Sequence, residues 1–142
     1  MTGVTIPPEC LRTIGDLAER AYPAECCGLL VGCRDVDSDE VRITRIVPSI
    51  NLLAEETPRR FEVDPALRFR LMRELRGGPE EIVGHYHSHP DGPAVPSARD
   101  AEMAFEPDLL WVIVSAGAGG ATETAAYFPL PEGGGFSRAP LL

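Results

Sequence analysis

Three histidines stand at alternate positions in one short stretch of the sequence, GHYHSHPDGPAVPSARD. They are His85, His87 and His89, and the sequence of 142 residues holds no others. If this stretch begins as a β-strand, residues two apart point to the same face, so His87 and His89 present their imidazoles toward one point. Paired imidazoles suit zinc, and a catalytic zinc keeps three protein ligands with a water in the fourth position. The spacing therefore predicts a metal site that needs a third ligand.

Asp100 is the expected third ligand. The proline-rich loop 90–96 can fold back and place Ser97 at the N-cap of a helix, with Asp100 in its first turn. Each motif alone favours a structural role, because an HxH pair arises often and Ser97 with Asp100 also fits a helix capping box. Together they are far more specific: HxH, ten residues, then Asp, with Ser three residues before it. His85 lies on the same strand face and is the alternative third ligand, but we expect it beside the ligands or facing the substrate.

The hydrophobic spacing and the capping residues predict three helices that position these side chains. The first lies within 7–23, opening at two prolines and closing before a third. The second opens with Asp64 as N-cap and Pro65 in its first turn and ends at a pair of glycines, and the third opens at Ser97. The apolar residues expected to pack on a sheet are Leu11, Ile14, Leu17 or Ala18, and Ala21 in the first helix, and Leu67, Leu71 and Leu75 in the second.

Apolar and β-branched runs bounded by turn residues predict the strands. The first two are joined by an acidic turn as an antiparallel hairpin, and the run LLWVIVS is typical of a strand buried on both faces. The glycine- and proline-rich stretch 131–142 is expected to be loosely held. This order predicts an α/β fold, a mixed central sheet flanked by helices, in one domain spanning 1–142. The expected strands are 28–34, 41–48, 61–64, 81–87, 109–115 and 122–128.

The composition limits the partners and the location of the protein. Its formal net charge of −9 and its 13 basic residues, scattered along the chain, argue against nucleic acid as a partner. The N-terminus lacks the basic start and apolar run of a signal peptide, and no apolar run is long enough to span a membrane, so we expect a cytoplasmic protein. The cysteines are expected to be buried free thiols, and Cys26 and Cys27 have no basic neighbour to activate them.

The motifs HSHP and SARD, with PAECCGLLVG upstream, resemble those of the JAMM (MPN-plus) zinc metalloproteases, in particular the small stand-alone prokaryotic members. The resemblance runs from the first helix to TETAAYF. It implies that His87, His89 and Asp100 bind one zinc ion with a bound water. It also implies that Glu25 is the general base and that the Ser97 hydroxyl helps to hold the oxyanion. The implied JAMM/MPN fold is similar to the cytidine-deaminase-like architecture.

The resemblance to the prokaryotic members also implies a reaction: hydrolysis of a peptide or isopeptide bond after the C-terminal Gly-Gly of a ubiquitin-like or sulfur-carrier protein. The chemistry agrees, because zinc lowers the pKa of a bound water to about 7, so that Glu25 can take its proton and later pass it to the leaving amine. A Gly-Gly tail can enter a narrow groove and pair with an exposed strand edge. That edge is expected in the strand containing His87 or in the segment after NLLAEE.

Two alternatives belong to other functional classes. A non-catalytic MPN-type scaffold would bind partners without metal, but such modules typically lose part of the ligand set, and here the whole set is present. A zinc deaminase would need HxE and PCxxC motifs, which the sequence lacks. The sequence leaves open the identity of the carrier protein, the leaving group and the formation of a homodimer.

Overall fold

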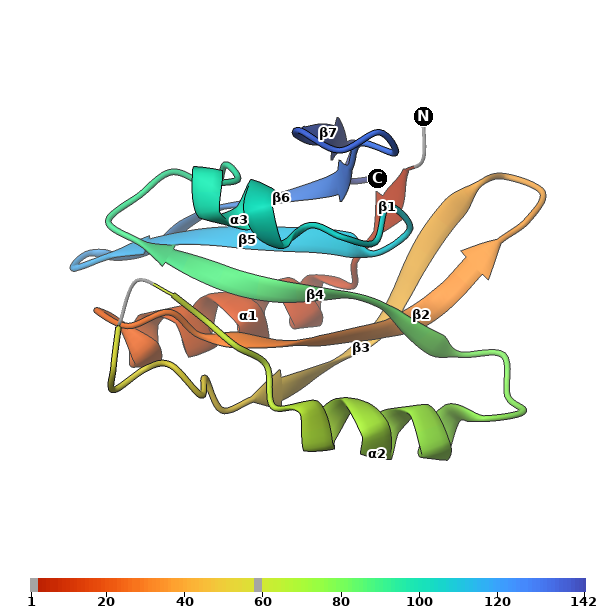
Figure 1. The fold of residues 1–142 in the computed structure, drawn as a ribbon, viewed down its shortest axis with the longest axis horizontal. Helices are drawn as coiled ribbons and strands as arrows, with labels where there is room; N and C mark the ends of the chain where they lie inside the picture. Colours follow the sequence, from red (N-terminus) through yellow and green to blue (C-terminus); the bar gives the residue numbers. More distant parts are fainter. Residues whose placement is uncertain (1–2, 58–59) are drawn as a thin grey trace.

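The computed structural model describes residues 3–57 and 60–142 of the chain. Within these ranges a mixed sheet of seven strands runs in the order β1-β3-β2-β4-β5-β6-β7, with three helices packed on it (Figure 1). This arrangement confirms the expected α/β fold. The helices are α1 (Pro8–Ala21), α2 (Pro65–Leu75) and α3 (Ala98–Met103). The strands are β1 (Val4–Thr5), β2 (Cys27–Asp35), β3 (Glu40–Ser49), β4 (Glu81–Pro90), β5 (Leu110–Gly117), β6 (Gly120–Pro129) and β7 (Phe136–Ala139).

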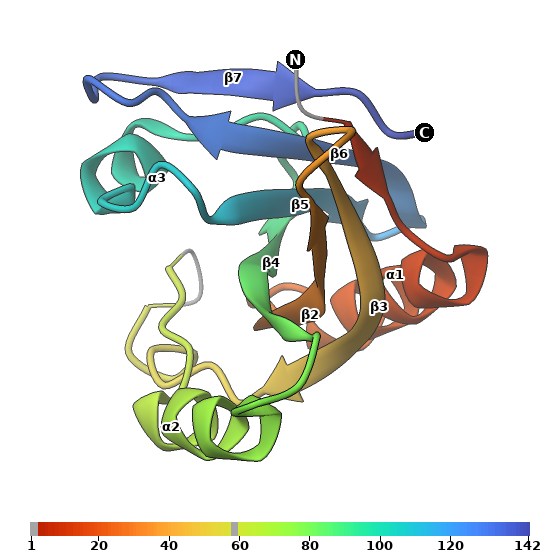
Figure 2. The same ribbon diagram turned by 90° about the vertical axis from the view of Figure 1, so that its right-hand side faces the viewer.

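The helices lie on opposite sides of the sheet, α1 on one side and α2 and α3 on the other (Figure 2). Under α1 an extensive apolar core forms around Ile14 and Tyr86. On the opposite face a smaller cluster packs Leu71 of α2 against the sheet, and a second one surrounds Trp111. His85 of β4 contacts Trp111 of the cluster on this face, with ring centroids 4.3 Å apart. Because residues two apart on a strand share a face, His87 and His89 also face the side of α2 and α3.

The first helix confirms its expected bounds and part of its expected buried stripe, Ile14 and Ala18. α1 begins at Pro8, where the missing N–H is harmless because the first turn has no intrahelical acceptor for it. Its fully buried residues are Cys10, Ile14 and Ala18. Leu11, expected on the stripe, packs only at the margin of the core. The buried face of α1 therefore runs through Cys10, Ile14 and Ala18.

The second and third helices begin as their capping residues predict. The Asp64 carboxylate accepts the N–H of Ala66 at 3.0 Å, and Leu67 and Leu71 are buried against the sheet. Ser97 is the N-cap of α3 and forms a complete capping box there. None of the helices in residues 3–57 and 60–142 has the length and apolar character that a membrane span requires.

Strand β4 lies in the middle of the sheet. It pairs antiparallel with β2, where Cys27 is opposite His87, and parallel with β5, where His87 is opposite Ile113. It also continues to Pro90, beyond its expected end, so that His89 belongs to the strand. Because neighbouring strands pair with β4 on both sides, the expectation that the strand containing His87 offers an exposed edge is wrong.

The ends of the chain and the segment before α2 differ from expectation. The C-terminal stretch is not loosely held: β7 pairs with β6, and Leu141 bridges to Val4 in β1. Segment 61–64 was expected as a strand, but within the described residues it makes an isolated bridge between Asn51 and Val63. Strands as short as these carry too few alternating residues to be recognised, and their pairing depends on partners distant in the sequence.

The cysteines, all within the described residues, have free thiols as expected. Cys10 and Cys27 are buried, whereas Cys26 and Cys33 are only partly so. Burial raises the pKa of Cys27 to about 12 and also raises that of Cys26. Both thiols are therefore protonated at neutral pH, as expected for packed cysteines and not for nucleophiles.

Candidate metal centre

The last two histidines of β4 bring their imidazoles together. Residues 87 and 89 are two apart on an extended strand, so both rings project from the same face. The Nε2 atoms of His87 and His89 lie 3.0 Å apart. His87 has no exposed surface, while His89 is partly exposed at the end of the strand. The strand spacing thus places two nitrogen donors side by side.

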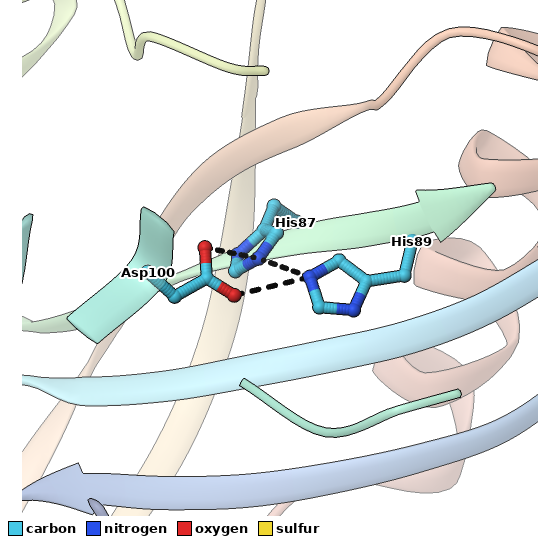
Figure 3. Close-up of side chains that lie close together, drawn as sticks. All are labelled: His87, His89 and Asp100. Atoms are coloured by element: carbon cyan, nitrogen blue, oxygen red, sulfur yellow. Dashed lines mark hydrogen bonds and ion pairs between the residues drawn. The ribbon is translucent and has the colours of Figure 1, made fainter. Parts of the chain in front are cut away.

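Asp100 meets these nitrogens from the first turn of α3. Its Oδ1 lies 3.4 Å from Nε2 of His87, and its Oδ2 lies 3.1 Å from Nε2 of His89 (Figure 3). The capping box fixes this carboxylate, because the Ser97 N–H donates to Asp100 Oδ2 at 2.9 Å while the Asp100 N–H donates to Ser97 Oγ at 3.0 Å. One atom from each of His87, His89 and Asp100 lies within 4.8 Å of the others.

The loop between β4 and α3 is held so that α3 starts beside the histidines. The Ser115 hydroxyl donates to the carbonyl of Gly92 at 2.5 Å, and the buried Tyr127 hydroxyl donates to that of Ala94 at 2.7 Å. Both donors come from the neighbouring strands β5 and β6. The fold-back of the loop is therefore determined by contacts with the sheet as well as by its prolines.

The hydrogen bonds of His89 indicate a cation at this point. Its Nδ1 lies 3.0 Å from the carbonyl of Pro93, and because a carbonyl can only accept, Nδ1 carries the proton. In a neutral ring Nε2 then holds a lone pair directed at a carboxylate oxygen of Asp100, 3.1 Å away. Two acceptors at this distance repel unless a proton or a metal ion lies between them. The donor set of two imidazoles and one carboxylate suits zinc.

For Asp100 and His87 the surroundings favour the protonation states in which such residues bind metal. Burial opposes ionisation of Asp100, but hydrogen bonds with His87 and His89 outweigh it and hold the pKa of this carboxyl below its ordinary value. Burial lowers the pKa of His87. For His89 burial acts in the same direction, but hydrogen bonds with Asp100 and the Pro93 carbonyl outweigh it and raise the pKa. A neutral buried imidazole beside an ionised carboxylate is ready to coordinate a divalent ion.

Glu25 reaches the same place from the segment between α1 and β2. It is buried, with 7% of its surface exposed, which is uncommon for an acidic residue. It lines one cavity with Ser97 and Asp100, and a second hollow with Ser97 and His89. The structure therefore brings together the five residues that the sequence motifs single out.

The larger cavity, of about 330 Å³, extends from Asp100 toward α2. Its walls include Leu29 and Trp111, and His85 is part of its lining. Burial lowers the pKa of His85 to about 3, and its Nδ1 has no hydrogen-bond partner in the described residues. His85 is not in the group of converging ligand atoms found in residues 3–57 and 60–142. His85 thus lines the cavity beside the converging ligand atoms, and its role toward the substrate stays a prediction.

Phe61 is a neighbour of the site that the sequence motifs do not reveal. Its ring stacks on His87 with a centroid distance of 4.2 Å and an interplanar angle of 16°, while Trp111 approaches His87 edge-on at 5.7 Å. These contacts fix the ring plane of His87 and exclude water from it. An isolated phenylalanine in an irregular segment carries no signal by which the sequence could identify this role.

Comparison with protein families places the chain. A family model described as prokaryotic homologs of the JAB domain matches residues 7–127. The chain belongs to this Prok-JAB family. The Prok-JAB match runs from the start of α1 into β6 and includes Glu25 and the motifs of β4 and α3. It confirms the resemblance to the small prokaryotic JAMM proteins.

Curated relatives and solved structures are similar to the chain to different extents. The desampylase of Haloferax volcanii is 39% identical over 94 residues, covering 66% of this chain and 63% of the relative. The CysO-cysteine peptidase of Mycobacterium tuberculosis is 36% identical over 98 residues, covering 69% of this chain and 63% of the relative. The chain thus spans less than two thirds of the length of these relatives. A solution structure from Desulfitobacterium hafniense is 29% identical with a TM-score of 0.81, covering 98% of this chain and 91% of that one.

Proposed function

We propose that this chain is a zinc metallopeptidase of the JAMM type, in which His87, His89 and Asp100 bind one zinc ion. The observation that carries the proposal is the convergence of two imidazole nitrogens and a carboxylate beside the buried Glu25. Three protein ligands of this kind are typical of a catalytic zinc site, which keeps a fourth position for water. The family membership and the similarity to a desampylase and a peptidase support it.

Each proposed catalytic side chain is placed for a distinct step. Bound zinc would polarise the substrate carbonyl and lower the pKa of a water to about 7. The Glu25 carboxylate lines both hollows beside Ser97 and would take the proton of that water, then deliver it to the leaving amine. Ser97 Oγ accepts the N–H of Asp100, which leaves its own O–H free to donate to the oxyanion of the tetrahedral intermediate.

The proposed substrate is a ubiquitin-like or sulfur-carrier protein with a C-terminal Gly-Gly, cleaved at the peptide or isopeptide bond after the second glycine. The names of the two relatives, desampylase and CysO-cysteine peptidase, support an enzyme that cleaves such conjugates. The tail cannot pair with β4, which already has two neighbours. Residues 60–63 line the cavity and are the remaining candidate from the expected strand edges.

The test uses carrier-protein fusions that bear an extension after Gly-Gly. The purified protein is incubated with each fusion, with and without a chelator, and the products are measured by intact mass. Cleavage directly after Gly-Gly that stops with chelator and returns with zinc is the expected result. If the zinc content of the protein stayed close to zero, both after gentle purification and after zinc was added, the non-catalytic scaffold would be the better description.

A further inference from the structure

Ser88 lies between the two proposed zinc ligands of β4 and is itself fully buried. Because side chains alternate along a strand, it points to the α1 side of the sheet, away from the imidazoles of His87 and His89. Its Oγ accepts the backbone N–H of Cys26 at 2.8 Å, and its own backbone N–H donates to the carbonyl of Cys26 at 3.1 Å. A side chain outside the proposed metal site thus contacts the residue next to Glu25.

These two bonds mark the place where β2 leaves the regular sheet ladder. In an antiparallel pair, every second pair of opposite residues exchanges two backbone N–H···O=C bonds. The regular ladder between β2 and β4 ends at the pair Cys27 and His87, so Cys26 and Ser88 would be the next pair. There the hydroxyl of Ser88 takes the N–H of Cys26 in place of a backbone carbonyl. The chain can therefore turn away from the sheet at this point without leaving a buried N–H unpaired.

Asn51 holds the other end of the same peptide unit. Its Nδ2 donates to the carbonyl of Glu25 at 3.0 Å, and that carbonyl and the Cys26 N–H belong to one planar amide group. Asn51 is itself fixed, because its Oδ1 accepts the N–H groups of Leu53 and Glu62, each at 3.0 Å. The amide that follows the Cα of Glu25 is thus bonded at both its oxygen and its nitrogen.

We propose that Ser88 and Asn51 clamp this amide and thereby position the Glu25 carboxylate for proton transfer. The inference rests on the proposed function, because it assigns Glu25 the role of base. A fixed amide plane leaves Glu25 little backbone freedom on its C-terminal side, so its side chain starts from a defined point and direction. Ser88 and Asn51 are positioning residues, because neither supplies a converging ligand atom or lines the two hollows beside Glu25.

The first test replaces the hydroxyl of Ser88. Ser88→Ala is expected to lower kcat by about 10-fold to 100-fold, the cost of a misplaced catalytic group, while KM changes little and bound zinc is unchanged. In amide hydrogen exchange the N–H of Cys26 should exchange at least about 10-fold faster in the variant. If Ser88→Ala does not fold, Ser88→Cys keeps the volume with a weaker acceptor and should show the same changes to a smaller degree.

A double-mutant cycle separates positioning from general damage. If Ser88 acts through Glu25, then adding Ser88→Ala to Glu25→Gln should lower kcat no further. Ser49→Ala is the matched control, because Ser49 Oγ also accepts a backbone N–H, from Asp64 at 2.9 Å, without touching the Glu25 amide. This control should leave kcat unchanged.

Three results would overturn the clamp. One is that Ser88→Ala lowers kcat by the same factor in the wild type and in Glu25→Gln. The others are a loss of bound zinc in Ser88→Ala, and an unchanged exchange rate of the Cys26 N–H in that variant. A failure of the proposed function would look different. The wild-type protein would then bind zinc without cleaving any Gly-Gly fusion, and Glu25 would lose its role as base. Faster exchange of the Cys26 N–H in Ser88→Ala would in that case still locate the structural clamp.

Discussion

Removing the imidazole of His89 should weaken zinc binding, whereas removing that of His85 should not. Nε2 of His89 lies 3.0 Å from Nε2 of His87 and 3.1 Å from Oδ2 of Asp100, inside the converging group of ligand atoms. His85 lies on the same strand face but lines the neighbouring cavity. The two variants, His89→Ala and His85→Ala, remove the same side chain from one strand and so control for each other.

The expected size of the effect follows from the share of one ligand in zinc binding. Structural sites with four protein ligands bind zinc with a free energy of about 10–16 kcal/mol, or about 3 kcal/mol per ligand. Losing one ligand therefore corresponds to about 100-fold weaker zinc binding. With zinc in excess, 100-fold weaker binding removes about 2.7 kcal/mol of zinc-dependent stabilisation. For a chain of 142 residues the unfolding entropy is about 0.3 kcal/mol per degree, so the gain in Tm on adding zinc should fall by about 9 °C.

Calorimetry of the wild type and both variants, each with and without zinc, measures this difference. Comparing the Tm of each variant with and without zinc cancels any loss of packing that the substitution causes. His85→Ala should keep nearly the full wild-type gain in Tm. An equal loss of the gain in both variants, or a larger loss in His85→Ala, would refute the choice of His87, His89 and Asp100 as the ligands.

Three further predictions concern other residues of the site and its surroundings. Glu25→Gln should keep bound zinc and KM but lower kcat by at least about 100-fold, because it removes a base and no ligand; steady-state kinetics at wild-type rate would contradict the mechanism. Ser97→Ala should lower the free energy of unfolding by about 1 kcal/mol, through loss of the α3 cap, and kcat by about 100-fold. Denaturant titration measures the free energy of unfolding and steady-state kinetics measure kcat. An unchanged kcat would exclude Ser97 from oxyanion binding. Burial raises the pKa of Cys27 from 9.0 to about 12, so the unfolded chain loses this proton at lower pH than the folded one. The free energy of unfolding should therefore fall between pH 9 and about 12 by up to about 1.4 kcal/mol per pH unit. Urea unfolding at several pH values should show a steeper fall of this free energy with pH in the wild type than in Cys27→Ala. Equal slopes in the two proteins would contradict the effect of burial.

Much of the fold near the site is predictable because its signals are local. Asp64 followed by a proline marks the start of α2, and Ser97 three residues before an aspartate marks that of α3; both starts are as expected. The alternation of β4 likewise predicts that His87 and His89 share a face. Capping and strand periodicity act over a few residues, so they are visible in a short stretch of sequence.

Other features depend on contacts between distant segments and were missed or mistaken. The C-terminal stretch looks flexible by composition, yet it forms β7 because the free edge of β6 provides a backbone partner for it. Strand β4 looks like a possible edge, yet β2 and β5 pair with it on both sides. The order of strands in a sheet follows from long-range packing, which the local hydrophobic pattern does not encode.

The sequence by itself determined the types and spacing of the residues that converge at the end of β4. The period of two in a strand and the capping box of a helix are enough to pair His87 with His89 and to orient Asp100. Only the tertiary structure decided that Glu25, from the segment after α1, lies beside them, and that Ser88 and Asn51 hold its amide. The reason is physical: the backbone bonds that place Glu25 join three segments far apart in the chain, and they exist only once β2 has paired with β4.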